Sequence, residues 1–311
     1  MRRLLAQGSI LAAALLWPAA AAAHGDTVPV SELASAWEPS PVVLAVAMLL
    51  LALFLQGWIR LRRRGRADHA PVWRLLCFLA ALALGVLPLV SPLDAVAEEY
   101  LLSAHMLEHV LMADAAVALA LVAVSGPLLF FMLPKPALLA VGRSPGARTA
   151  LRTLDHPLVA FGIWCGVIAL WHVPALYEAA LTSRTVHDLE HATFVLAGLL
   201  IWYQLIDPAR KGHLSRGQRL GLAAGMFAAG QVLSSVLLFA TRPIYPAYAA
   251  QDERLFGLTA LTDQRLAGAV MMAEQAVVIG AFGLLLLLAA DEEARTEPGG
   301  RGPVVPLGPQ A

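Results

Sequence analysis

Charged side chains are scarce in this sequence. Asp, Glu, Lys and Arg make up 14% of its 311 residues, whereas hydrophobic residues make up 59%, and the mean hydropathy is +0.69. Because soluble domains carry about 25% charged residues, this composition excludes an ordinary soluble domain and indicates a membrane protein. Acidic and basic side chains number 22 each, so the zero net charge gives no sign of a nucleic-acid partner.

Cysteine is almost missing. The two cysteines, Cys77 and Cys165, lie far apart and inside apolar runs, which excludes a disulfide framework and a Cys-x-x-Cys redox or metal motif. We interpret them as packing residues. The sequence also lacks a nucleotide-binding loop and a soluble catalytic domain, so no energy coupling is expected.

The N-terminus has the layout of a secretory signal. Basic residues follow the initiating methionine, an apolar stretch comes next, and a run of small residues ends at Ala23. We therefore expect a signal peptide over residues 1–23 and an exported segment over residues 24–40. An uncleaved signal anchor is the alternative, and it also places His24 outside.

Apolar runs occupy most of the remaining chain, and a membrane helix needs about 20 such residues. Turn residues and charges divide these runs into seven predicted spans. The spans are Pro41–Ile59, Val72–Val90, Tyr100–Leu133, Pro157–Tyr177, Val186–Ile206, Leu220–Ala240 and Leu266–Ala290. The predicted fold class is therefore an all-α polytopic bundle, with a seven-helix membrane domain over residues 41–290. The Gly- and Pro-rich tail 291–311 is expected to be disordered and cytoplasmic.

The third predicted span is longer than a bilayer requires. The extra length indicates a tilt, a kink near Ser125-Gly126-Pro127, or an outer half that projects beyond the hydrocarbon.

Basic residues set the predicted orientation, because cytoplasmic loops are enriched in Lys and Arg. The bases follow the first, third and fifth spans, at Arg60, Arg62, Arg63, Arg64 and Arg66, at Lys135, Arg143, Arg148 and Arg152, and at Arg210, Lys211, Arg216 and Arg219. The loop 91–99 carries only acidic charges, and the arginines of the loop 241–265 are partly offset by acids. We therefore expect a multi-pass protein of the bacterial inner membrane, with an exported mature N-terminus and a cytoplasmic C-terminus.

Two copies of one motif enter the membrane from the predicted exported side. His105-Met106-Leu107-Glu108-His109 opens the third span, and His187-Asp188-Leu189-Glu190-His191 opens the fifth. Residues four apart share a helix face, so each motif presents two imidazoles to one point, as metal ligation needs. The alternative is a set of interfacial histidines that bond to Glu108, Glu190 or Asp188.

A further histidine, His172, ends the fourth span on the same side. Ionisable groups at membrane depth are costly and therefore usually functional. The predicted metal ligands are His105, His109, His172, His187 and His191. The side chains expected to support them are Glu108, Glu190, Asp188 and Asp263. About two to three helical turns deeper than Asp263, a path or second site is predicted at Met271, Met272, Glu274 and Gln275.

The metal is less well defined than the ligands, because imidazole suits copper, zinc, iron and nickel. The exported location and the nearby Met106 and Met112 favour copper, with zinc as the alternative. His69, His156 and His213 fall on the predicted cytoplasmic side, and no site is assigned to them.

An ordered string of motifs resembles a known family. The string comprises Asp155-His156-Pro157, Trp171-His172-Val173-Pro174-Ala175-Leu176-Tyr177, the second histidine motif, Asp207-Pro208, and Leu261-Thr262-Asp263-Gln264 followed by Gly268. With the first histidine motif, this region resembles the multi-spanning CtaG-type assembly factors of caa3-type cytochrome c oxidase.

The resemblance implies a role in the respiratory chain, in which the protein helps a terminal oxidase mature by delivering or retaining copper. The implied partners are the oxidase catalytic subunit or other assembly factors, within the lipid bilayer. The residues carried over are His105, His109, His172, His187, His191 and Asp263. Two departures indicate a divergent branch: Ala113–Val124 lacks the usual proline, and Met271-Met272-Ala273-Glu274-Gln275 replaces the usual end of the last motif.

Three other functions fit parts of this pattern less well. His-x-x-Glu-His also occurs in inverted zinc peptidases, which makes an intramembrane zinc metallohydrolase the main enzymatic alternative. We expect no enzyme, because such a peptidase needs one motif and a distal ligand, whereas here the motif is doubled. Haem ligation is disfavoured because histidines four apart on one helix do not easily serve two haems. A copper permease would use the deeper polar residues.

Overall fold

The computed structural model describes residues 28–296, and over this range the chain contains helices and no strand. Six of these helices are long and apolar enough to cross a membrane. A seventh span is formed if a pair of helices bent by 74° is counted as one. The prediction of an all-α polytopic bundle is confirmed. The predicted signal peptide and His24 lie outside the described residues.

The helices follow one another with short connections. Their bounds are α2 (Pro41–Arg63), α3 (Val72–Val90), α4 (Pro92–Glu99), α5 (Leu102–Val110), the π-helical turn η3 (Leu111–Ala115), α6 (Ala116–Val124), α7 (Pro127–Met132), α8 (Lys135–Arg143), α9 (Pro145–Leu154), α10 (Pro157–Trp171), α11 (Pro174–Thr182), α12 (Arg184–Ile206), α13 (Arg216–Leu238), α14 (Pro246–Ala250) and α15 (Ala260–Thr296). Short 3-10 turns lie at η1 (Leu33–Ser35), η2 (Ala67–His69) and η4 (Leu255–Gly257).

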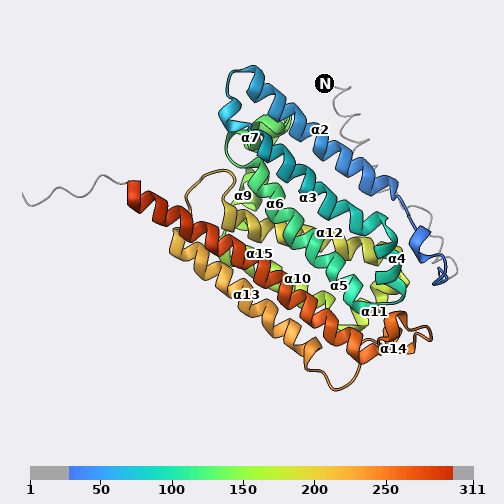
Figure 1. The fold of residues 1–311 in the computed structure, drawn as a ribbon. Helices are drawn as coiled ribbons and strands as arrows, with labels where there is room; N and C mark the ends of the chain where they lie inside the picture. Colours follow the sequence, from blue (N-terminus) through green and yellow to red (C-terminus); the bar gives the residue numbers. More distant parts are fainter. Residues whose placement is uncertain (1–27, 297–311) are drawn as a thin grey trace, which may run out of the picture.

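The continuous span formed by α5, η3 and α6 lies at the centre of the bundle (Figure 1). It packs against α3, α12 and α15, while α2 packs beside α3 and α7, and α13 lies along α15. The central span, Leu102–Val124, is 56% buried over its most apolar window, compared with 11% for α2. Polar groups on the central span are therefore shielded by protein, as intramembrane ionisable groups require.

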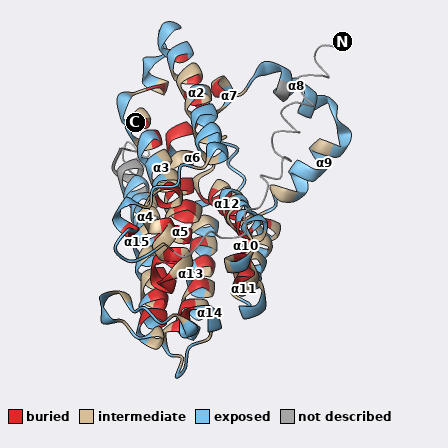
Figure 2. Cartoon of the chain, turned by 90° about the vertical axis from the view of Figure 1, so that its right-hand side faces the viewer, coloured by how far each residue is buried: buried red, intermediate tan, exposed pale blue. Residues whose placement is uncertain are grey.

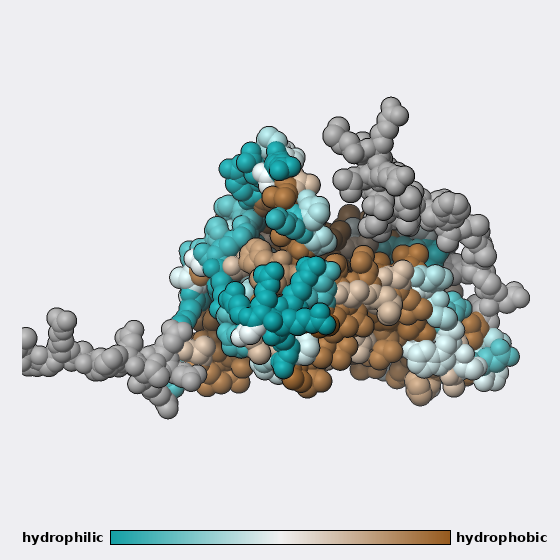
Figure 3. Space-filling view, turned by 90° about the horizontal axis from the view of Figure 1, so that it is seen from above, coloured by the Kyte–Doolittle hydropathy of each residue, from teal (hydrophilic) through white to brown (hydrophobic). Residues whose placement is uncertain are grey.

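Many residues of the outer helices are exposed (Figure 2). Large exposed hydrophobic residues on α2 include Val42, Leu44, Val46, Met48 and Leu49. Figure 3 shows apolar surface in the middle of the molecule and more hydrophilic surface towards its ends. A surface of this kind fits contact with lipid acyl chains, and the helices satisfy their own backbone hydrogen bonds there.

The long third predicted span breaks at Ser125-Gly126. Of the three explanations for its length, namely a tilt, a kink and a projecting outer half, the structure agrees with the kink. Gly126 has a φ of 76°, a conformation that favours glycine, and its N–H donates to the Pro208 carbonyl at 2.7 Å. The Arg74 guanidinium donates to the Ser125 carbonyl. The chain then resumes as the separate helix α7, so the extra length is not a tilted continuation.

The predicted fourth span is wrong beyond Trp171. The helix α10 ends there, and Tyr177 belongs to the separate helix α11, because Pro174 lacks the N–H that would continue the first helix. At the other end of the chain, α15 continues past Ala290 to Thr296. The rest of the predicted tail, 297–311, lies outside the described residues.

Candidate metal centre

Four histidines from the two repeated motifs meet between α5 and α12. Nε2 of His105 lies 2.9 Å from Nε2 of His109, and Nε2 of His109 lies 3.1 Å from Nε2 of His191. The rings of His187 and His191 have centroids 4.0 Å apart, and those of His105 and His187 are 5.6 Å apart. The structure therefore brings together four of the five predicted ligands.

The ligand atoms form two overlapping sets that share His105. One set is His105, His187 and His191, and the other is His105, His109 and Glu190; within each, the ligand atoms lie within 4.8 Å of one another. Nitrogens about 2.0–2.1 Å from a tetrahedral metal are separated by about 3.3 Å. The spacing of these imidazole nitrogens therefore fits a transition-metal ion.

Proton counting also favours a metal over a purely hydrogen-bonded cluster. His109 Nε2 has two imidazole nitrogens within 3.1 Å, those of His105 and His191. A neutral imidazole carries one N–H proton. If this proton is on His109 Nε2, it can form a good hydrogen bond with only one of the two neighbouring nitrogens. Metal coordination would use the lone pairs of all three nitrogens.

The tautomer of His105 is fixed by Tyr248, which lies in α14. The Tyr248 hydroxyl is 2.6 Å from the Ala97 carbonyl oxygen and 3.2 Å from His105 Nδ1. Because a carbonyl oxygen only accepts, the single tyrosine proton is donated to Ala97, and the tyrosine oxygen accepts from His105 Nδ1–H. His105 Nε2 therefore has a free lone pair that faces the other imidazoles. No sequence motif marked Tyr248.

His187 is oriented by a carboxylate from α4. Its Nδ1 lies 3.1 Å from Glu98 Oε1. A carboxylate on the second ring nitrogen commonly orients metal-ligating histidines and raises their basicity. Sequence reasoning used Glu98 only to assign the topology of its loop. A sequence feature that could have indicated a role for Glu98 is the pair of acids four residues apart, Asp94 and Glu98, in a loop without bases.

The two motif glutamates differ in their surroundings, although both are fully buried. Glu190 Oε1 lies 4.0 Å from His109 Nε2, so it faces the imidazoles. Glu108 instead lies near Asp94, and neither of its carboxylate oxygens has a hydrogen-bond partner among the described residues. Burial raises the pKa of Asp94 to about 7, and the negative charge of Glu98 adds to this effect. The carboxylates of Asp94 and Glu98 on α4 therefore lie close to that of Glu108 on α5, beside the histidines.

Two predicted site residues, His172 and Asp188, are not among the converging ligand atoms. His172 caps the end of α10, where its Nδ1 lies 2.7 Å from the Ile168 carbonyl, and it belongs to neither ligand set. The Asp188 side chain is 66% exposed and pairs with Arg184 at 3.4 Å. Both therefore take part in local contacts within or next to their own helices.

Asp263 supports the site from a distance by capping α5. Its carboxylate accepts hydrogen bonds from the backbone N–H groups of Leu102 and Ser103 at 2.7 and 3.2 Å, and from the Ser103 hydroxyl at 2.5 Å. These are among the first N–H groups of α5, which have no partner inside the helix. A negative charge there also complements the helix dipole. The cap holds in place the turn that carries His105.

The deeper residues predicted on α15 form a polar patch of their own. Met271 packs in the same apolar cluster as Met106, Tyr177 and Tyr248. Both carboxylate oxygens of Glu274 are buried without a hydrogen-bond partner among the described residues. Its charged neighbour is Asp114.

Asp114 and Gln275 complete this patch from two sides. Asp114 lies on the π-helical turn η3 and accepts from the Trp202 indole at 2.7 Å. Gln275 accepts from Gln231 at 3.4 Å. Met272 is partly buried on the same helix. The patch begins one helical turn beyond His109, but no ligand set connects the two.

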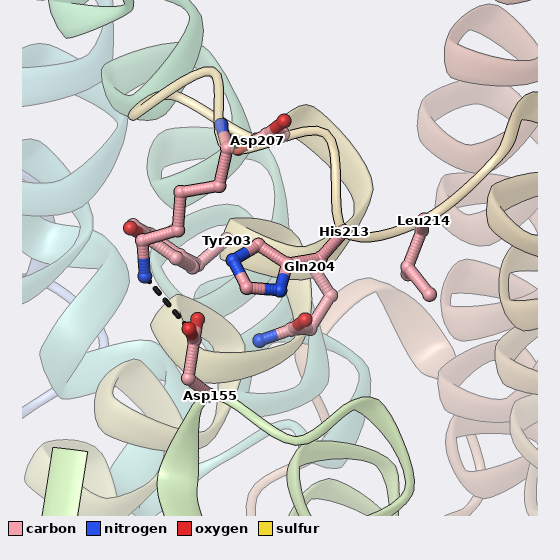
Figure 4. A pocket seen from close by; sticks show the side chains of 7 residues that line it. Asp155, Tyr203, Gln204, Asp207, His213 and Leu214 are labelled. Atoms are coloured by element: carbon pink, nitrogen blue, oxygen red, sulfur yellow. Dashed lines mark hydrogen bonds and ion pairs between the residues drawn. The ribbon is translucent and has the colours of Figure 1, made fainter. Parts of the chain in front are cut away.

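A small cavity beside Asp155, Tyr203, Asp207 and His213 lies near the C-terminal end of α12 (Figure 4). Its volume is about 10 Å³, which is enough for one water molecule at most. Lys211 bonds to Asp155 there at 2.7 Å. The ion pair fixes the loop beside the cavity, and the cavity is too small for a substrate.

Comparison with known proteins identifies relatives of low similarity. The chain is 26% identical over 204 residues to the uncharacterized proteins Mb0105 of Mycobacterium bovis and MT0111 of Mycobacterium tuberculosis. The match covers 62% of this chain but 30% of each relative. No solved structure matches the chain.

A family model gives the broader match. The model described as cytochrome c oxidase caa3 assembly factor covers residues 52–290, which include all six long helices in whole or in part and every residue of the histidine cluster. The chain therefore belongs to the cytochrome c oxidase caa3 assembly factor family.

Proposed function

We propose that this assembly factor holds a copper ion at His105, His109, His187 and His191 and passes it to a catalytic subunit of the oxidase. The single observation that carries the proposal is the convergence of three imidazole nitrogens at 2.9 and 3.1 Å. Imidazole binds copper well, and copper(II) forms the most stable complexes among the divalent first-row metals. Zinc is the alternative ion.

The surroundings of the cluster support a transfer role. Glu98 and Tyr248 hold two of the imidazoles through their second nitrogens, whereas Glu190 lies near enough to replace a histidine as a ligand. Two overlapping ligand sets let an ion change partners in steps without leaving the site. Stepwise exchange of ligands is what a carrier needs, because its ion must eventually leave.

The proposal also assigns the histidine cluster to one side of the membrane. The histidines lie near the N-terminal ends of α5 and α12, and the basic loops lie at the opposite ends of these spans. The positive-inside rule supports a location of the cluster on the exported side of a bacterial inner membrane. Labelling of single cysteines placed at Glu253 and at Arg64 by an impermeant reagent tests this: the first is expected to react in intact cells and the second only after lysis.

We further propose that the chain catalyses no reaction. Glu108, the general base that the first motif would supply in a metallohydrolase, lies near Asp94 and belongs to neither ligand set. Glu190 offers the second possibility, since it lies 4.0 Å from His109. Proteolysis by the wild type that is abolished in Glu190→Gln would revive the enzymatic alternative.

A deletion strain tests the proposed function. Plasmid-borne wild type and His213→Ala, whose histidine lies outside the cluster, are expected to restore oxidase activity and oxidase copper content. His105→Ala/His187→Ala is expected to restore neither while the variant reaches the membrane in normal amount. Normal copper content in the oxidase of the deletion strain would contradict copper delivery.

A further inference from the structure

The helices α8 and α9 form an arm that stands away from the bundle (Figure 2). Between positions 135 and 154 the arm carries Lys135, Arg143, Arg148 and Arg152 and contains no acidic residue. It also exposes large hydrophobic side chains, at Leu138, Leu139, Val141 and Leu151. An environment that suits this arm must therefore offer negative charge to the basic side chains and apolar contact to the hydrophobic ones.

The two kinds of side chain are sorted on α9. Arg148 and Arg152 lie one turn apart on the same side of the helix, and Leu151 lies beside them. These three residues line an open hollow on the surface. Ala147 and Leu154, on the apolar side, are partly buried. The helix is thus amphipathic, with guanidinium groups next to an exposed aliphatic side chain.

The course of the chain places this helix beside a membrane span. Only Asp155 and His156 separate α9 from α10, and the two helices are bent by 74° relative to each other. If α10 crosses the membrane, the bend orients α9 roughly parallel to the membrane surface. A helix of this length spans about 15 Å, so its arginines stay near the headgroups.

We propose that the α8–α9 arm is a binding surface for anionic phospholipid headgroups. Arg148 and Arg152 contact the phosphate, and Leu151 inserts towards the acyl chains. Basic amphipathic helices bind at the interface through this combination of charge attraction and apolar burial. An acidic protein surface would satisfy the arginines but gives no reason for the bend that follows α9. This inference does not depend on the metal proposal.

Lipid titration of the purified full-length chain, followed by native mass spectrometry, tests the proposal. Phosphatidylglycerol and phosphatidylcholine with identical acyl chains are the probes. The wild type is expected to bind phosphatidylglycerol more tightly. Arg148→Gln/Arg152→Gln is expected to lose about 25-fold in that affinity, because each basic residue near an anionic surface contributes about fivefold. Arg148→Lys/Arg152→Lys keeps the charge and is expected to keep most of the affinity.

The matched control is Arg63→Gln/Arg66→Gln, which removes the same charge from an exposed basic loop outside the arm and is expected to lose clearly less affinity than the arm variant. Thermal unfolding of each variant shows whether it folds. Equal binding of the two lipids by the wild type, or an equal loss in the control, would overturn the proposal. Binding of a polyglutamate peptide without any preference for phosphatidylglycerol would also overturn it, and would assign the arm to an acidic protein partner.

Discussion

Tyr248 accepts a hydrogen bond from His105 across 143 positions of the chain, at 3.2 Å. The contact joins α14, in the loop between α13 and α15, to the first histidine of α5. Tyr177 of α11 bonds to the same hydroxyl at 3.2 Å. Two short helices outside the long spans, α11 and α14, thus influence how one imidazole presents its lone pair.

Replacement of Tyr248 by Phe removes the hydroxyl and keeps the ring. His105 Nδ1 then loses its acceptor, so the ring is freer to rotate or change tautomer. Partners of this kind contribute about 10–100-fold to metal affinity, and we expect a loss of that size in a chelator competition titration. Tyr245→Phe is the control, because Tyr245 donates to the His172 carbonyl. Equal affinities in wild type and Tyr248→Phe would contradict the positioning role.

Replacement of Asp263 by Ala removes the cap of α5. Loss of an N-terminal cap costs about 0.5–2 kcal/mol of stability, and we expect a lower thermal unfolding temperature in detergent. Metal affinity is expected to fall while the stoichiometry is kept, since Asp263 touches none of the four histidines. Asp188→Asn, on an exposed side chain, should change stability by less than about 0.5 kcal/mol. A loss of stoichiometry in Asp263→Ala would indicate direct ligation instead.

Asp94 makes the stability depend on pH. Its pKa is raised from 3.8 to about 7 in the folded chain, so between these values the folded state holds a proton that the unfolded state releases. Stability is therefore expected to fall as pH rises through this window. In Asp94→Asn this contribution disappears. The unfolding temperature of the variant should then change less than that of the wild type between pH 4.5 and 7.5, all other groups being equal. Parallel curves for the two proteins would contradict the raised pKa.

Gly198 allows α12 to pack closely on the π-helical turn. A Cβ at this position would lie 2.1 Å from the Ala113 carbonyl oxygen, which is backbone and has little room to move. Gly198→Ala is expected to destabilise the chain by about 1–3 kcal/mol and to weaken metal binding by separating the two histidine helices. Gly166→Ala, in α10 with nothing within 4 Å of its Cβ, is the matched control. Similar unfolding temperatures for both variants would show that the close packing is not needed.

The sequence predicts the long helices and the shared face of each histidine pair, because both depend on local periodicity. The bounds of α3 agree with the predicted span Val72–Val90. Errors occur where prolines divide apolar runs, as at Pro174 between α10 and α11. An apolar run shows that a segment is buried in lipid or protein, but it does not show where the backbone bends.

The residues that contact the histidine cluster were harder to predict than the histidines themselves. Glu98 and Tyr248 reach the histidines through contacts between distant segments, and no spacing rule connects residues in different loops. Asp263 was predicted at the correct height, yet it bonds to the backbone of α5 and not to an imidazole. Sequence position gives depth in the membrane, whereas the partner of a side chain depends on how the helices are rotated and packed.

Metal analysis of the purified protein tests the central claim most directly. Wild type and His105→Ala/His187→Ala are each equilibrated with limiting Cu(I), Cu(II) and Zn(II), and the bound metal is counted after gel filtration. We expect close to one copper ion per wild-type chain and almost none in the variant, with both proteins equally folded by circular dichroism. No bound metal in the wild type would contradict it, and the converging imidazoles would then be a hydrogen-bonded element of a scaffold that carries no ion.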